Sequence, residues 1–72
     1  MLGFTERLLI MRKNGKISQK QAASVMDVSE TQYQNYEYGK HLPTIDKIEK
    51  LCRCFNISAD WLLGLSDNPE RL

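Results

Sequence analysis

Two helix-start signals of the same kind occupy the middle of this chain and limit how it can fold. Both fit the S-x-x-Q capping box, Ser18 with Gln21 and Ser29 with Gln32. In this motif the serine hydroxyl accepts from a backbone N–H three residues on, and the glutamine side chain reaches back. Only residues 26–28 lie between the first helical segment and the second cap. The pattern predicts a helix, a tight turn and a second helix.

Apolar and polar residues divide the two helices into faces. Ala22, Ala23 and Met26 share one face of the first helix, where small side chains would allow a close crossing. In the second helix, expected from Glu30 to about Tyr38, helical spacing places Tyr33 and Tyr36 on the inward half. The opposite half carries Glu30, Thr31, Gln34 and Asn35. We therefore expect the two tyrosines in the core and these four polar residues at the surface.

The flanking sequence predicts three more helices. Residues 4–14 place Phe4, Leu8 and Met11 on one stripe, and Asn14-Gly15 ends it. Leu9 and Ile10 fall off that stripe, so they either broaden the core face or form an exposed patch for a partner. Thr44 is expected to cap a fourth helix, in which Ile45, Ile48, Leu51, Cys52 and Phe55 follow at helical spacing.

After Asn56 breaks that helix, Ser58 caps a last one, in which Leu62 and Leu63 are expected to be buried before Gly64 ends it. We predict an all-α bundle of about five short helices over residues 1–65, and a loose tail over 66–72. Trp61 is ambiguous, because it could edge the core or join a dimer surface with Leu65.

Composition and charge restrict the class of protein. The 72 residues are 42% hydrophobic and 26% charged, which suits one small globular domain. The longest apolar run covers only residues 8–11, so we expect neither a membrane span nor a signal peptide, and a cytoplasmic protein. Net charge is only +1, but basic residues gather in or beside the central motif: Arg12, Lys13, Lys16, Lys20 and Lys40. This distribution predicts modest non-specific affinity for nucleic acid.

Neither a metal site nor catalytic chemistry is indicated. Cys52 and Cys54 stand two apart in a helix and point about 200° from one another, so they cannot easily share a metal or a disulfide. His41 is the single histidine, which leaves a zinc site without ligands. No nucleophile–base pair or Gly-rich phosphate loop is present. We expect no cofactor and no enzyme.

The ordered series of motifs resembles the Cro/phage-repressor class of helix-turn-helix DNA-binding domains, the xenobiotic-response-element family. The matching features are Gln19, Ala23, Val28-Ser29, Tyr36-Glu37, Gly39-Lys40, Pro43-Thr44, 55–58 and 60–64. Asp27 departs from the glycine that the family favours in the turn, although Asp tolerates positive φ better than most residues. The resemblance implies a repressor-like fold with the second motif helix in the major groove of double-stranded DNA.

That resemblance, with the chemistry of the polar half, suggests base readers. Gln34 and Asn35 can bond bidentately to adenine, and the methyl group of Thr31 can meet a thymine methyl. Glu30 is awkward, because phosphates repel its carboxylate, although it could accept from cytosine N4. The alternative is a merely solvated polar face.

The resemblance also implies backbone contacts and one internal brace. Candidates for phosphate contact are Gln19, Ser18, Arg12, Tyr38, Lys40, His41 and Lys47. Gln19 lies in the first turn of its helix, where free N–H groups can receive an anion. In the family an arginine at Arg12 commonly pairs with a glutamate at Glu37, so we expect an ion pair there.

The sequence and the resemblance together predict a sequence-specific DNA-binding transcriptional regulator. We expect it to act as a repressor and to bind DNA as a homodimer. Its dimer surface could include Trp61, Leu65 and the C-terminal tail. The main alternative is a protein-interaction module of the same fold, antitoxin-like or dimerising, with weak or no DNA binding. Glu30 and the near-neutral charge favour that alternative.

Overall fold

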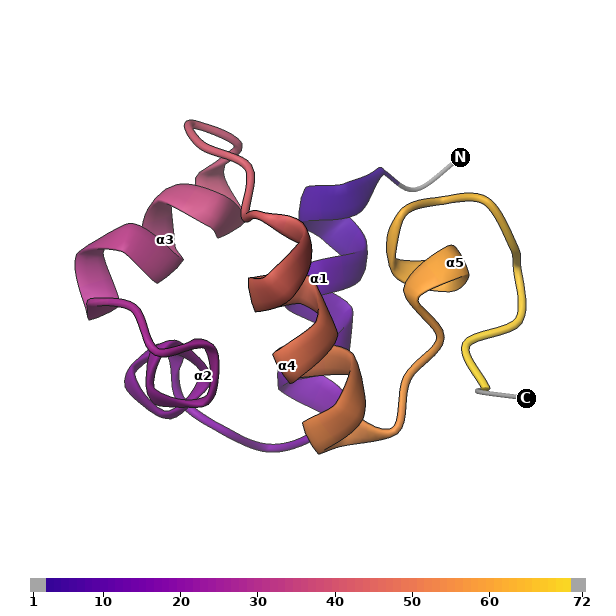
Figure 1. Ribbon diagram of the computed structural model, residues 1–72, viewed down its shortest axis with the longest axis horizontal. Helices are drawn as coiled ribbons and strands as arrows, with labels where there is room; N and C mark the ends of the chain where they lie inside the picture. The colour runs from indigo at the N-terminus through magenta and orange to yellow at the C-terminus, as the bar shows by residue number, and fades with distance from the viewer. Residues whose placement is uncertain (1–2, 71–72) are drawn as a thin grey trace.

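The computed structural model describes residues 3–70. In this range the chain folds into five α-helices and forms no β-sheet (Figure 1). The helices are α1 (Phe4–Asn14), α2 (Gln19–Met26), α3 (Glu30–Tyr38), α4 (Ile45–Phe55) and α5 (Ala59–Leu62). Helices α2 and α3 pack on one side of α1 and α4, and the short α5 packs on the other (Figure 1). The predicted all-α class and the helix-turn-helix are confirmed.

The caps of the two central helices differ from each other. The Ser18 hydroxyl accepts from the Gln21 N–H at 3.0 Å, and the Gln21 side chain accepts from the Ser18 N–H at 2.8 Å, so this capping box is complete. Ser29 accepts from the Gln32 N–H at 3.1 Å. The Gln32 side chain turns instead to the ring of His41, 3.3 Å away. The second box is therefore only half formed, because a tertiary neighbour competes for Gln32.

Left-handed backbone closes three of the helices. Asp27, at φ 58°, occupies the tight turn as expected for a residue in place of glycine. Gly39 ends α3 at φ 80° and Asn56 ends α4 at φ 54°. The end of α1 differs from the prediction, because Gly15 stays helical and Lys16 takes the positive φ of 57°.

All five helices contribute buried side chains to one core. Its buried members are Leu8, Met11, Ala22, Ala23, Met26, Tyr33, Tyr36, Leu51, Cys52, Trp61 and Leu62. The rings of Tyr33 and Tyr36 meet edge to face, with centroids 6.5 Å apart. Both tyrosines are inward, as the periodicity predicts, and α3 is thereby pressed against α1 and α2 by its aromatic half.

Arg7 is a buried charged residue that the periodicity did not single out. Its guanidinium lies 5.1 Å from the ring centre of Trp61 and donates to the carbonyl oxygens of Trp61 at 3.0 Å and Ser66 at 3.2 Å. An Nη atom also lies 3.6 Å from the Asp67 carboxylate. Trp61 is only 9% exposed, which leaves it at the core edge and gives it little surface for a dimer.

The described part of the C-terminal segment, residues 66–70, lies along the body of the domain. Ser66 and Asp67 of this segment contact Arg7. The Pro69 carbonyl accepts from the Ser58 N–H at 2.8 Å, and Glu70 forms an isolated antiparallel bridge with Ile57. Residues 71 and 72 of the predicted loose tail lie outside the described residues. The segment has no helix, but backbone hydrogen bonds hold residues 66–70 in place.

Three apolar predictions come out differently. Ile10 packs against the core, whereas Leu9 is exposed, so the two alternatives for this pair divide between them. Leu63 was expected to be buried and is 47% exposed. Ile45, at the start of the α4 stripe, is 85% exposed. Both side chains line an open groove between α4 and the segment containing α5.

Candidate nucleic-acid interface

Helix α3 presents a polar half to solvent. Glu30 and Thr31 are exposed at its start, and Gln34 and Asn35 are half-buried one turn later. None of the four is turned into the core, since Tyr33 and Tyr36 fill the inward side. The arrangement leaves a row of short carboxylate, hydroxyl and amide groups along one side of a rigid helix. Such groups can bond to base edges in a major groove.

A buried ion pair braces α3 against α1. Nε of Arg12 donates to Oε2 of Glu37 at 2.6 Å, and Nη2 donates to Oε1 at 3.3 Å. Nη1 donates to the Ile17 carbonyl at 3.1 Å, so all three guanidinium nitrogens are engaged. Arg12 is 9% exposed. It is therefore a structural residue first, with little of its guanidinium left for a phosphate.

The environment of Glu37 keeps its carboxylate ionised. Burial opposes the charge, but the hydrogen bonds from Arg12 and Gln19 outweigh it and hold the pKa of Glu37 below its usual value. The bond with Glu37 likewise raises the pKa of Arg12 despite partial burial. Burial, and then the Glu37 charge, raise the pKa of Tyr33, so its phenol stays neutral. Its hydroxyl makes no hydrogen bond within residues 3–70, so the charge of Glu37 acts on it through space.

Gln19 connects the ion pair to the polar half of α3. Its Nε2 donates to Oε1 of Glu37 at 3.0 Å, and its Oε1 accepts from Nε2 of Gln34 at 3.2 Å. The resemblance implied that Gln19 contacts a phosphate and supports the first reader of the second motif helix, and the structure shows it bonded to Gln34, one turn further along that helix. No spacing rule reveals this pair, because the two residues belong to different helices and meet only through the crossing of α2 and α3.

The other candidates for phosphate contact surround this surface. Ser18, Tyr38, Lys40 and His41 are exposed, the first before α2 and the others at or after the end of α3. Lys47 is half-buried, and its Nζ donates to the carbonyl of Asp27 at 3.4 Å. Lys47 therefore fastens α4 to the tight turn.

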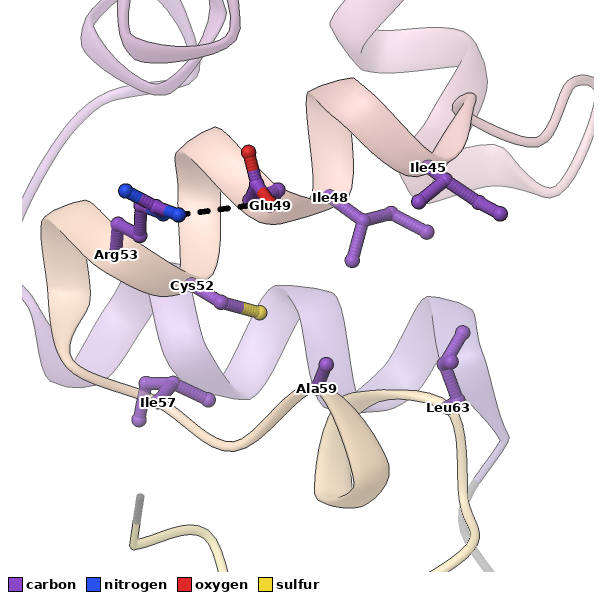
Figure 2. A pocket seen from close by; sticks show the side chains of 8 residues that line it. All are labelled: Ile45, Ile48, Glu49, Cys52, Arg53, Ile57, Ala59 and Leu63. Atoms are coloured by element: carbon purple, nitrogen blue, oxygen red, sulfur yellow. Dashed lines mark ion pairs between the residues drawn. The ribbon is translucent and has the colours of Figure 1, made fainter. Parts of the chain in front are cut away.

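A second surface feature lies away from α3. Figure 2 shows a groove between α4 and the segment containing α5, with Ile45, Ile48 and Leu63 among its lining side chains. Its volume is about 420 Å³. At its edge Arg53 lies 3.6 Å from Glu49, one helical turn away.

Neither a metal site nor a membrane span is found in the part of the chain that the structure describes. No three His, Cys, Asp or Glu residues among 3–70 are arranged to hold an ion. Cys52 is buried and Cys54 exposed, and the two form no disulfide. No helix in the same range is long and apolar enough to cross a bilayer.

Comparisons with known proteins identify the kind of domain. The sequence model of a family described as helix-turn-helix matches residues 8–62. The chain is 33% identical over 67 residues to the uncharacterised HTH-type transcriptional regulator YobD of Bacillus subtilis, covering 93% of this chain and 60% of that protein. It is 39% identical over 59 residues to the cryptic phage CTXphi transcriptional repressor RstR of Vibrio cholerae, covering 82% of this chain and 53% of that protein.

The chain is also 34% identical over 66 residues to the HTH-type transcriptional regulator ImmR of Bacillus subtilis. The match covers 92% of this chain and 52% of that protein. The chain thus spans about half to three-fifths of the length of these curated relatives. Among solved structures, the P22 c2 repressor protein, crystallised with a synthetic operator, matches with a TM-score of 0.82. At 24% identity, over 92% of this chain and 100% of that one, the likeness shows a shared fold.

Proposed function

This chain belongs to the helix-turn-helix family, and from that premise we propose that it is a sequence-specific DNA-binding transcriptional regulator, in kind a repressor. It acts in the cytoplasm on double-stranded DNA, and the proposal assigns it no catalytic step and no cofactor. The observation that carries the proposal is the polar half of α3, which stands clear of the core on a helix braced by the Arg12–Glu37 pair.

In this proposal α3 lies in the major groove. Gln34 and Asn35 bond to base edges, Thr31 meets a thymine methyl, and Glu30 accepts from cytosine N4. Around them, backbone contacts fix the position of the domain without choosing the sequence. The residues assigned to that role are Ser18, Gln19, Tyr38, Lys40, His41 and Lys47.

Selection of bound fragments from random duplex DNA tests this function. We expect the protein to enrich a short motif, and fluorescence titrations at low salt to show tighter binding to that motif than to random duplex. A protein that binds no duplex of any composition contradicts the proposal. That result would favour the alternative, a protein-interaction module of the same fold. The exposed carboxylate of Glu30 and the net charge of +1 are consistent with this alternative.

We also propose that the domain binds DNA as a symmetric dimer, with half-sites about one helical turn (~34 Å) apart. Because Trp61 is covered by Arg7, the better surface is the groove of α4 and α5, which exposed Ile45 and Leu63 line. Leu65 is exposed as well. Glu49 and Arg53 favour a second copy as the occupant. Opposite charges one turn apart on one helix complement themselves across a two-fold axis.

Sedimentation of two charge variants tests the dimer. Ile45→Glu places a carboxylate in the groove, and we expect it to shift the protein towards monomer and weaken binding to a two-half-site duplex. Cys54→Glu is the matched control, because Cys54 is exposed nine residues along α4 and about 180° around it. Identical sedimentation of both variants and the original protein would contradict an interface in this groove.

A further inference from the structure

We infer that Gln32 orients the imidazole ring of His41, and that binding of a DNA phosphate at this ring takes up one proton. The inference rests on the proposed function, in which His41 is one of the backbone contacts, and it adds a link between pH and affinity. It starts from one contact, between Nδ1 of His41 and Oε1 of Gln32 at 3.3 Å.

The loop after α3 carries the ring back to the side of that helix. The backbone N–H groups of Lys40 and His41 both donate to the carbonyl of Asn35, at 2.9 and 3.3 Å, which holds the loop on the last turn of α3. Gln32 lies three residues before Asn35 and therefore on the same side of the helix. The ring is thus fixed at the edge of the polar half of α3. Phosphates flank a helix that lies in a major groove, so this edge is a place for a backbone contact.

The partner of Nδ1 decides what the other ring nitrogen can do. A glutamine oxygen only accepts hydrogen bonds, so Nδ1 carries the hydrogen in this contact. In the neutral ring Nε2 then has no hydrogen and is itself an acceptor, which cannot bond to a phosphate oxygen. Once the ring is protonated, Nε2 becomes a donor on the side of the ring that faces away from Gln32. The contact with Gln32 therefore makes protonation a condition for the phosphate bond.

The surroundings of the ring leave Nε2 available. His41 is exposed, and no hydrogen bond of Nε2 is found within residues 3–70. The protonated ring also admits only one direction for the amide of Gln32. Both of its nitrogens are donors, so Gln32 must face Nδ1 with oxygen, as it does here. The free protein thus already holds the ring in the orientation that the phosphate-bound ring needs.

Other ionisable groups near the loop do not replace His41 in this role. In the described part of the chain the ring forms no ion pair. Carboxylates, phenols and amines ordinarily keep their charge between pH 5.5 and pH 8, whereas imidazole does not. The ionisable side chains on the elements around the loop are Glu6 on α1, Glu30, Glu37 and Tyr38 on α3, Lys40 in the loop, and Asp46 and Lys47 at the start of α4.

Calorimetry counts the proton. Titrations of a selected duplex at pH 7, in two buffers that differ in ionisation enthalpy, give the number of protons taken up for each bound domain. We expect uptake by the original protein and none by His41→Asn, whose side chain has no proton to gain. Uptake by the original protein and His41→Asn alike would assign the proton to another group and overturn the inference.

Affinity and its salt dependence should change with the same proton. From pH 8 to pH 5.5 binding of the original protein should strengthen about tenfold, as the gain of one hydrogen bond to a charged group requires. The salt dependence should be steeper by about one unit at pH 5.5, because one more phosphate is neutralised. In His41→Asn both quantities should stay the same across this range.

The orienting role of Gln32 is tested by Gln32→Met, which keeps the length of the side chain and removes the acceptor for Nδ1. Ser24→Met is the matched control, since it puts the same side chain on the exposed side of α2. In Gln32→Met the neutral ring can offer an N–H from either nitrogen, so the gain at low pH should shrink to about threefold. The control should keep the full gain. An unchanged gain in Gln32→Met would overturn the orienting role.

NMR of the free protein tests the same step without DNA. His41 is the single histidine, so the signals of its ring nitrogens need no assignment. At pH 8 the neutral ring should carry its hydrogen on Nδ1 in the original protein and in Ser24→Met, and Gln32→Met should lose this preference. A hydrogen on Nε2 in the original protein would mean that Gln32 faces the ring with its N–H₂, and the inference would be wrong.

Failure of the inference can be told from failure of the proposed function. A protein that binds the selected duplex equally well at pH 5.5 and pH 8, and takes up no proton, contradicts the inference alone. A protein that binds no duplex at either pH contradicts the proposed function, and the proton link fails with it.

Discussion

Arg12 and Glu37, which lie 25 positions apart in the chain, form a two-pronged ion pair whose side chains are 11% and 5% exposed. The pair joins the end of α1 to the end of α3. Because it also supplies the charge that orients Gln19, a contact that stabilises the fold extends to the polar half of α3. The following predictions concern that connection and the surface that it supports.

Removing the cation should destabilise the domain strongly. In Arg12→Met the buried Glu37 carboxylate keeps its charge but loses its main partner, and we expect a loss of about 3–5 kcal/mol in the free energy of unfolding. Urea unfolding followed by circular dichroism measures it. Arg53→Met, which breaks the exposed pair with Glu49, should change stability by less than about 0.5 kcal/mol. Similar losses for both variants would show that the buried Arg12–Glu37 pair contributes no more to the free energy of unfolding than the exposed pair.

Stability should fall in acid because of Glu37. Its folded pKa lies below the ordinary value of 4.5, so its contribution is fully present above that value and is lost as the pH falls through the folded pKa. Urea midpoints between about pH 3 and pH 7 report this loss. In Glu37→Gln the acid-dependent part of the change should be smaller, although the variant starts less stable. An equally steep fall in the variant would assign the acid sensitivity to other carboxylates.

Base readers and backbone contacts should separate in binding measurements. Gln34→Ala or Asn35→Ala is expected to weaken binding to the selected duplex by roughly 1–3 kcal/mol and to spare binding to random duplex. Lys40→Ala should weaken binding to all duplexes alike and reduce the salt dependence by about one unit, as the loss of one phosphate contact requires. Titrations at several salt concentrations measure both effects. If the two amide variants weaken specific and random binding equally, these residues do not read bases.

The turn after α3 should require glycine. Gly39→Ala has room for its Cβ, whose nearest neighbour would be the Thr5 side chain at 3.5 Å, so the cost comes from the backbone at φ 80°. We expect a loss of about 1–2 kcal/mol in the free energy of unfolding. Gly3→Ala, at φ −88° on the N-cap of α1, meets no such strain and should cost less, about 0.5 kcal/mol, by the same urea measurement. Equal losses would mean that conformation at Gly39 is not limiting.

The sequence predicted the features that depend on local spacing. The bounds of α1, α3 and α4, the Ser18 cap and the inward tyrosines follow from periodicity or from the chemistry of one residue. The positive φ of Asp27 was implied by the family resemblance. Residues on the surface of α3 could be named for the same reason. Their role as DNA contacts stays a prediction.

Features that depend on the packing of distant segments could not be read in the same way. Nothing in the spacing of residues 4–14 marks Arg7 as the buried partner of Trp61 and Ser66. The exposure of Ile45 and Leu63 depends on how α4 and the segment containing α5 pack, and helical spacing alone places both on apolar stripes. Likewise, Gln32 has the position of a capping residue, but its side chain bonds to His41 because the loop after α3 folds back towards it.

The central claim is that DNA lies along the outward half of α3, and amide chemical-shift mapping tests it most directly. When a selected duplex is added to ¹⁵N-labelled protein, the largest shifts should fall on Thr31, Gln34 and Asn35 and on the first turn of α2. Shifts confined to the groove of α4 and α5, or no shifts at all, would contradict the account.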